Sequence, residues 1–396
     1  MRALLTLSLL ALLGACASTG GRIMVPGTDQ VASVEAVAAE VADADLVALG
    51  ELHQTPGVHR THHALLRAIH RRRPDLVIAM EMFERDVQSV LLQYLSGLIS
   101  EDEFRAKSRP WPNYARDYRP VIEFAKRHKL MVLAANAPRP LATKAAKEGL
   151  QAVLGERNLA RATSAPRDGY WESFQEMMAG HGGMLGEGGM ERYYAAQCLK
   201  DDTMAESIVD HLATFAPAQR PLAVLICGRA HSDHGWGTVQ RVVERMPGIE
   251  VRVLSAEAVD DVGGGAVAAS SDVADYIVFA EAPQRAPAPT PAASGEPGDP
   301  AKNPEGLRPA FGFMPDYEGE DEGVLVGQVF EGRPAFEAGI EEGDRILAIN
   351  GMPTLDLEEY TEVLDTLIIG RTVTVRVRRE EAEVDLQVEV GSRAAR

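Results

Sequence analysis

The chain is poor in cysteine and carries no excess of positive charge. It has 396 residues, 3 cysteines and a formal net charge of −18. So few cysteines in a chain of this length do not make a disulfide framework. The acidic balance and the lack of a basic patch argue against nucleic acid as a partner.

The N-terminus has an apolar run, but it is too short to span a bilayer. Residues 3–13 are rich in Leu, and Leu13-Gly14-Ala15-Cys16 fits the motif at which bacterial lipoproteins are cleaved and lipidated. We therefore expect residues 1–15 to be a signal peptide and residues 16–29 to be the lipidated Cys16 with its tether. The alternative is an ordinary secretory signal with an incidental cysteine.

The expected lipid anchor sets the location of the protein. It would hold the mature chain on a membrane of the bacterial cell envelope, outside the cytoplasm. Ala17 after Cys16 favours the periplasmic face of the outer membrane. Only Cys198 and Cys227 then remain, and the sequence leaves open whether they pair.

A segment crowded with Pro, Ala and Gly divides the rest of the chain into two domains. Residues 284–305 lack apolar periodicity and are expected to form an extended linker. A domain of residues 30–283 precedes this linker, and a smaller domain of residues 306–393 follows it. The length of the chain suits two domains.

Six apolar stretches in the first domain have the pattern of strands buried on both faces, because Val, Ile and Leu run almost continuously through them. Amphipathic segments such as 56–72 and 84–96 separate them, and residues 140–220 have a mostly helical pattern. This alternation predicts an α/β domain with a mostly parallel sheet, flanking helices and a helical insertion. The expected strands are residues 45–50, 75–80, 130–135, 221–227, 250–254 and 275–280.

Carboxylates and imidazoles follow these strands where each one ends. Glu51 and His53 follow the first strand, Glu81 the second, Asn136 the third and His231 the fourth. Because ligand and catalytic sites assemble at the carboxyl ends of parallel strands, we expect these residues to share one pocket. The residue types suit a divalent metal ion or general acid–base catalysis. Each residue taken singly would more simply be a helix cap or a surface side chain.

The helix expected over residues 56–72 contains further histidines. It begins near the end of the first strand, so His59 and His62 should lie closest to the pocket, with His63 at the edge of the apolar face. A solvated helix edge with one core histidine explains the same pattern. The residues leave both interpretations open.

A cluster after the second strand suits a flat or anionic ligand. Trp111 and Tyr118 offer aromatic faces, and Arg119 and Arg139 offer guanidinium groups that pair with carboxylates. Loop packing is the alternative explanation for the same residues.

A glycine-rich segment offers soft or borderline iron ligands. Six of the residues 180–189 are glycine, so this segment is not expected to form a helix or a strand. His181 would then lie on a mobile loop, where it could bind iron. The alternative is a loop that is merely flexible. The helix that follows carries Tyr193, a candidate phenolate ligand. It also places Gln197 and Asp201 on one face.

Taken together, these motifs resemble the ChaN-like lipoproteins, known as the cofacial haem-binding domain, over roughly residues 30–282. The resemblance implies an α/β domain on a lipid tether that binds haem in iron acquisition, with two haems face to face in a homodimer. The shared motifs include Gly50-Glu51-x-His53, Glu81-Met82-Phe83, Tyr118-Arg119-Pro120, Asn136-x-Pro138-Arg139 and Gly228-x-x-His231. The candidate haem contacts are His53, Trp111, Tyr118, Arg139, His181, Tyr193, Gln197 and His231.

The two strand-end turns are also similar to those of a wider group that contains the Tiki and TraB proteins and the erythromycin esterases. That similarity implies a hydrolytic site, in some members metal-dependent, made of Glu51, His53, Glu81 and His231. We therefore interpret the chain as a haem-binding lipoprotein. The alternatives are a metal-dependent hydrolase or peptidase and a non-catalytic scaffold.

The second domain resembles a bacterial PDZ domain over about residues 306–393. The stretches 332–340 and 342–351 match the most recognisable part of that family. The resemblance implies a mainly β fold that binds a protein or peptide, between a carboxylate-binding loop and a helix over residues 356–368. The acidic run 316–322 should repel a free carboxylate, so the groove would prefer basic or internal peptides or dock on the first domain. The candidate peptide contacts are Phe311, Gly312, Phe313, Tyr360, Val363 and Leu364.

Overall fold

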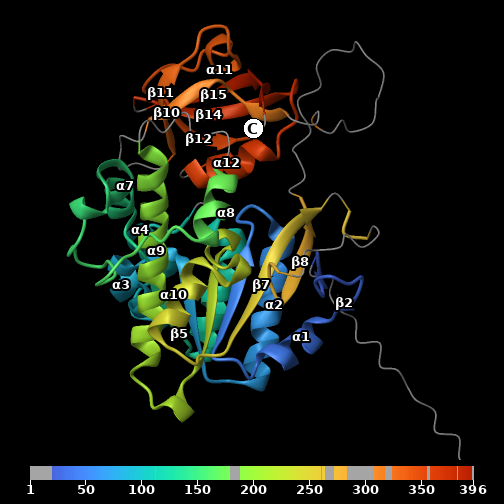
Figure 1. Cartoon of the computed structure of the whole chain (residues 1–396), viewed down its shortest axis with the longest axis vertical. Coiled ribbons are helices and arrows are strands. Elements are labelled where there is room, and N and C mark those ends of the chain that lie inside the picture. Colours follow the sequence, from blue (N-terminus) through green and yellow to red (C-terminus); the bar gives the residue numbers. More distant parts are fainter. Residues whose placement is uncertain are drawn as a thin grey trace, which may run out of the picture.

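The computed structural model describes most of both domains (Figure 1). The predictions for the signal peptide, Cys16, His181 and nearly all of the linker lie outside the described residues. Within the described part, no helix combines the length and the apolar character needed to cross a membrane. The described residues are 20–111, 113–178, 188–259, 261–263, 272–282, 303, 307–316, 323–354, 357–380 and 382–394.

The first domain is built on an eight-stranded sheet in the order β2-β1-β8-β7-β3-β6-β4-β5. Strands β3 to β8 pair in parallel, while β1 and β2 add an antiparallel edge. All six predicted strands are present, which confirms the mostly parallel sheet. The strands are β1 (Gly21–Met24), β2 (Val31–Ala32), β3 (Leu46–Glu51), β4 (Leu76–Glu84), β5 (Met131–Asn136), β6 (Leu222–Gly228), β7 (Val251–Val259) and β8 (Tyr276–Glu281).

Helices cover both faces of this sheet, because successive side chains of a strand point to opposite faces. In β3, Val47 and Leu49 pack in one apolar core, while Leu46 and Ala48 pack in another. The first core includes side chains of α1 (Val34–Val41), α2 (Pro56–Arg72), α3 (Gln88–Leu95), α4 (Glu101–Ser108), α5 (Tyr114–Asp117) and α6 (Arg119–His128). The second includes side chains of α9 (Gly189–Leu212) and α10 (Gly237–Arg245).

The predicted helical insertion is only partly an insertion. It contains α7 (Arg139–Glu148), α8 (Gly169–Met177) and α9. The second half of α9 packs on the sheet through Met204, Ala205 and Ile208, as the crossover helix of a parallel β5-to-β6 connection should. Its first half extends beyond the sheet and packs against α7.

The second domain is mainly β, as the PDZ resemblance implies. Its main sheet has the order β10-β11-β12-β14-β15, β13 pairs with β12, and β9 pairs with β16. Helix α12 occupies most of the range predicted for the groove helix. The elements are β9 (Leu307–Ala310), β10 (Phe313–Asp316), β11 (Val324–Val329), α11 (Pro334–Glu337), β12 (Arg345–Ile349), β13 (Met352–Pro353), α12 (Leu357–Asp365), β14 (Thr372–Arg379), β15 (Ala382–Glu389) and β16 (Gly391–Ala394).

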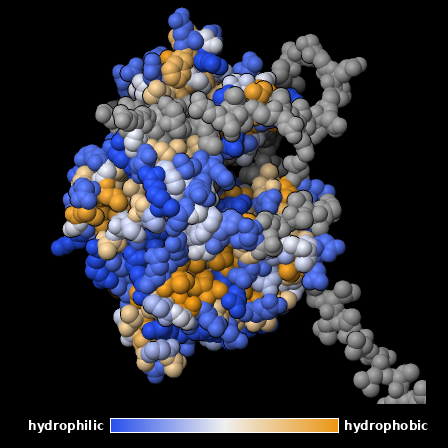
Figure 2. Space-filling model, viewed as in Figure 1, coloured by the Kyte–Doolittle hydropathy of each residue, from blue (hydrophilic) through white to orange (hydrophobic). Residues whose placement is uncertain are grey.

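The two domains share one apolar cluster. Tyr170, Phe174 and Met178 from α8 and its end join Tyr194 of α9 and the core of the second domain. Figure 1 accordingly shows α12 beside the end of α8. The remaining surface in this view is largely hydrophilic, with apolar side chains gathered mainly near α10 (Figure 2).

Candidate functional site

The carboxylate of Glu51, at the end of β3, is the centre of a buried polar cluster. The phenol of Tyr118 donates a 2.6 Å hydrogen bond to its Oε1, and Nδ1 of His53 lies 2.9 Å from the same atom. On the other side, Nδ1 of His59 lies 3.2 Å from Oε2. Since Glu51 is 0% exposed, these protein groups take the place of water around it.

Glu51 and His59 form a buried ion pair in this cluster. Burial alone would raise the pKa of Glu51, but His59 and His53 outweigh it and hold the pKa well below its usual range. Burial would lower the pKa of His59, yet Glu51 and Asp117 raise it. The second ring nitrogen of His59 donates to the carbonyl of His53 at 2.9 Å. Its Nδ1 lies within ion-pair distance of Oε2 of Glu51, although that oxygen accepts no hydrogen bond from the described residues.

A second cluster lies at the ends of β4 and β6. Nε2 of His231 lies 3.2 Å from Oε1 of Glu81, and its Nδ1 lies 2.7 Å from Oδ1 of Asp201 on α9. Burial opposes a charge on this ring, but the two carboxylates outweigh it and raise the pKa of His231 to about 10. His231 is therefore an imidazolium between two carboxylates at neutral pH.

Asp201 connects this second cluster to the helices around it. Its Oδ2 accepts a 2.7 Å hydrogen bond from the phenol of Tyr170 on α8. Its Oδ1 accepts a 2.8 Å bond from the hydroxyl of Thr238 on α10. The side-chain nitrogen of Gln197, one helical turn before Asp201, lies 3.3 Å from Nε2 of His231.

Gly228 allows the two clusters to touch. Its backbone N–H donates a 2.7 Å hydrogen bond to Oε2 of Glu81. A Cβ atom at this position would lie 2.8 Å from Nε2 of His53, so the glycine leaves the space that this ring occupies. His53 thus reaches from the Glu51 cluster to the Glu81 cluster, and Glu51, His53, Glu81 and His231 lie in one network. The fifth predicted strand-end residue, Asn136, is buried, but its Oδ1 accepts a 2.8 Å hydrogen bond from the backbone N–H of Ala137 instead.

The network is closed to solvent. Glu51, His53, Glu81 and His231 are 0%, 2%, 4% and 0% exposed. Among the described residues, no group of three or more His, Cys, Asp or Glu side chains is arranged to hold a metal ion. The structure therefore gives no support to the predicted divalent metal site, and the arrangement suits buried proton sharing.

The histidines of α2 fall into three different environments. His59 belongs to the Glu51 cluster, and His63 lies on the outer side of the helix near Phe124. His62 is 2% exposed, and neither of its ring nitrogens has a hydrogen-bond partner. Burial lowers the pKa of His62 to about 4, with a smaller contribution from His59, so its ring is neutral.

Four of the predicted haem contacts are buried inside the network. His53, Tyr118, Gln197 and His231 are at most 5% exposed, and their polar atoms face other protein groups. A side chain that contacts haem must be accessible to it, and the burial of these four side chains disfavours such a contact. Trp111, by contrast, is partly exposed and packs edge-on against His53, with 4.8 Å between ring centroids.

Two other predicted haem contacts are partly exposed. Arg139 begins α7, and Tyr193 lies in the first turns of α9. Tyr193 packs against the apolar cluster between these two helices. His181 lies outside the described residues.

Three contributors to the network were not predicted from the sequence. The sequence places Asp201 on one helix face with Gln197 without assigning it to the pocket, and it gives no signal for Tyr170 or Thr238. The i, i+4 spacing of Gln197 and Asp201 was the one available indication. The two remaining cysteines, Cys198 and Cys227, are free and buried.

The predicted peptide contacts gather on one side of the second domain. The rings of Phe311 and Phe313 lie 6.5 Å and 5.6 Å from that of Tyr360 on α12, and Val363 and Leu364 are buried in the same cluster. Gly312 between the phenylalanines has φ +80° and lies against the side chain of Arg333. Among the described strands, β10 pairs only with β11, so its other edge can add a peptide strand.

Comparison with curated and solved proteins gives partial matches. A probable periplasmic serine endoprotease, DegP-like, from Pseudomonas putida (strain W619) is 33% identical over 70 residues, which are 18% of this chain and 15% of that protein. The structure titled cofacial heme binding to ChaN of Campylobacter jejuni is 17% identical, covers 65% of this chain and 96% of its own, and has a TM-score of 0.49. The HtrA-type protease AlgW with a decapeptide is 27% identical over 22% of this chain and 30% of its own, with a TM-score of 0.21.

Two family models divide the chain as the folds do. A PDZ domain model matches residues 310–390. The model for haem-binding uptake, Tiki superfamily, ChaN matches residues 37–242, more than half of the 396 residues. The chain therefore belongs to the ChaN family of the Tiki superfamily and carries a PDZ domain at its C-terminal end.

Proposed function

We propose that this protein binds haem with its ChaN-like domain, on a lipid tether at Cys16, and recruits a protein partner through its PDZ domain. The observation that carries the proposal is the family match over residues 37–242. That range runs from α1 to α10 and includes the whole buried network. A tethered haem-binding domain outside the cytoplasm would serve iron acquisition or haem handling.

We place the haem against the outer face of α7 and α9. Tyr193 offers a phenol and Arg139 a guanidinium group on these adjoining helices, and both are partly exposed. A tyrosine phenolate is one of the ligands that hold haem iron, and arginine pairs with carboxylates such as the haem propionates. The buried network lies inward of this face and positions α9 through Asp201.

Titration of haemin into Tyr193→Phe and Arg139→Gln variants tests this placement. Each variant should bind haemin at least tenfold more weakly than the unchanged chain, and Tyr193→Phe should also alter the absorption spectrum of the bound iron. Two control variants lie away from α7 and α9: Tyr276→Phe, at a buried tyrosine of β8 that hydrogen-bonds Glu40, and Arg371→Gln, at an exposed arginine of the second domain. Unchanged affinity in both test variants would move the haem site elsewhere.

The lipid tether and the family's cofacial pairing have their own tests. Radiolabelled palmitate should enter the chain during bacterial expression and be absent from a Cys16→Ala variant. Haemin should also raise the mass of the unlipidated chain to that of a dimer. Palmitate incorporation into the Cys16→Ala variant would contradict the lipid tether. A mass that haemin leaves unchanged would contradict the cofacial dimer.

The buried network favours a second candidate function, hydrolysis of a peptide or ester. Two carboxylates and two imidazoles meet at the carboxyl ends of β3, β4 and β6, which haem binding alone does not require. Here His53, between Glu51 and Glu81, would move the proton. A Glu51→Gln variant should then lose turnover of ester or peptide substrates while remaining folded.

A further inference from the structure

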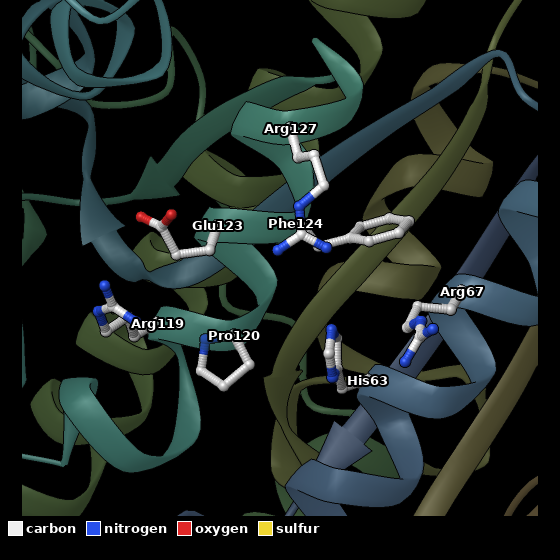
Figure 3. Close-up of a pocket in the computed structure, with 7 residues that line it drawn as sticks. All are labelled: His63, Arg67, Arg119, Pro120, Glu123, Phe124 and Arg127. Atoms are coloured by element: carbon white, nitrogen blue, oxygen red, sulfur yellow. The ribbon is translucent and has the colours of Figure 1, made fainter.

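A groove between α2 and α6 lies outside the buried network and outside the proposed haem face. It has a volume of about 300 Å³. Figure 3 shows side chains from the two helices facing each other across it. The lining residues are His63, Arg67, Arg119, Pro120, Glu123, Phe124 and Arg127.

Within the described part of the chain, two of the three groove arginines have side chains without a hydrogen-bond or ion-pair partner. Arg119 forms a bidentate pair with Glu101, at 2.6 Å and 2.8 Å. Among the residues that the structure describes, the guanidinium groups of Arg67 and Arg127 make no hydrogen bond or ion pair. Two guanidinium groups of like charge therefore face one space without an ion pair to either of them from the described residues. The one carboxylate in the lining, that of Glu123, accepts a hydrogen bond from the phenol of Tyr94.

The groove also offers an aromatic wall. The ring of Phe124 is buried and lies 6.0 Å from that of His63, between ring centroids. Burial, together with Arg67 and Arg127, lowers the pKa of His63. The positive charges of the two arginines are therefore felt inside the groove, and the His63 ring is neutral there at neutral pH.

We propose that this groove binds a small anionic ligand whose carboxylate or phosphate lies between Arg67 and Arg127 and whose apolar body rests against Phe124. The guanidinium fork pairs with both kinds of anion in the same bidentate geometry. An anion between the two arginines also relieves their mutual repulsion. Arg119 is held by Glu101 and is left out of this contact.

The size of the groove limits the ligand. A volume of about 300 Å³ is at the lower end of small-molecule sites, so one aromatic ring with an anionic group fits. A whole porphyrin does not, although a propionate at its edge could enter. Phthalate and phenyl phosphate are therefore suitable probes for the two anion chemistries.

Isothermal titration of the full chain, with Cys16→Ser to prevent lipidation, tests the proposal. At least one probe should bind saturably at one per chain, and the Arg67→Gln/Arg127→Gln double variant should bind it at least tenfold more weakly. Arg371→Gln, an exposed arginine of the PDZ domain, should leave binding unchanged. Because both groove arginines are exposed, the variants should unfold at the same temperature as the unchanged chain.

The outcomes separate the source of the anion from the existence of the site. Tighter binding of phenyl phosphate would identify a phosphate ligand, and tighter binding of phthalate a carboxylate ligand. Competition between haemin and phthalate would identify a haem propionate as that carboxylate. Absence of saturable binding by either probe, or equal affinity in the double variant, would overturn the proposal without affecting haem binding at α7 and α9.

Discussion

The ring of His231 is held by Asp201, 30 residues earlier in the chain, with Nδ1 2.7 Å from Oδ1. The same carboxylate accepts hydrogen bonds from Tyr170 and Thr238. One buried aspartate thus joins the end of β6 to α8, α9 and α10. The hydrogen bonds of Asp201 hold α9 in place, and a ligand that contacts the outer side of α9 would therefore bind to a rigid helix.

Replacement of Asp201 by Asn should destabilise the domain strongly. It leaves the His231 imidazolium with one carboxylate, and breaking a buried ion pair costs about 3–5 kcal/mol. Urea unfolding at pH 7 measures the loss. Asp210→Asn is the matched control on the same helix, because that carboxylate is exposed and pairs with Arg161; its effect should stay within about 0.5 kcal/mol.

The raised pKa of His231 predicts a loss of stability in alkaline solution. Burial opposes the charge, but Glu81 and Asp201 bring the pKa to about 10 in the folded chain, against about 6.5 when unfolded. The stabilisation is therefore complete below about pH 6.5 and is lost as the pH rises through 10. Urea unfolding from pH 6 to pH 10 should show this decline, and a flat profile would contradict a charged His231.

Replacement of His62 by Leu should stabilise the domain by about 1 kcal/mol at pH 7, because a buried polar group without a partner is costly. Burial lowers the pKa of His62 to about 4 in the folded chain, against about 6.5 in the unfolded chain. As the pH falls below about 6.5, the ring gains a proton in the unfolded chain but not in the folded chain, so the free energy of unfolding decreases. The variant should therefore lose less stability than the unchanged chain between pH 7 and pH 4. Lower stability at pH 7 would show that the ring has a partner.

Replacement of Gly228 by Ala should disturb the contact between the two clusters. The added Cβ would lie 2.8 Å from Nε2 of His53, so the ring must shift, and overpacking of this kind costs about 1–3 kcal/mol. Thermal unfolding measures the cost. The histidine proton resonances should move in the same variant, and unchanged resonances would place His53 outside the contact.

Replacement of Gly312 by Ala should abolish peptide binding by the PDZ domain. The φ of +80° disfavours a side chain, and a Cβ would lie 2.4 Å from the Cβ of Arg333. Fluorescence anisotropy with labelled C-terminal and internal peptides measures binding and shows which class is preferred. A variant that binds as well as the unchanged chain would place the peptide away from this loop.

Much of the first domain was predictable from local patterns. Continuous apolar runs such as Leu46–Leu49 mark strands buried on both faces, and the Gly-x-x-His turns follow two of them. Because parallel strands end at one edge, the sequence alone predicts that Glu51 and His231 lie together. The adjacency of β3 and β6 in the sheet brings them into one network.

Tertiary packing decided the rest. Asp201 enters the network because the long helix α9 packs over β5 and β4 and beside α10, which no spacing in the sequence specifies. Similarly, Arg67 and Arg127 lie on helices whose packing creates the groove, although each residue alone has the pattern of a solvated surface charge. The burial of Tyr118 and Gln197 also follows from packing rather than residue type.

Titration of the unlipidated chain with haemin, followed at the Soret band, tests the central claim most directly. Our account predicts a saturable shift at one haem per chain that is weakened by Tyr193→Phe and retained in Tyr276→Phe. A linear absorbance rise without saturation would contradict haem binding. The buried carboxylate–imidazole network would then be tested next for hydrolysis.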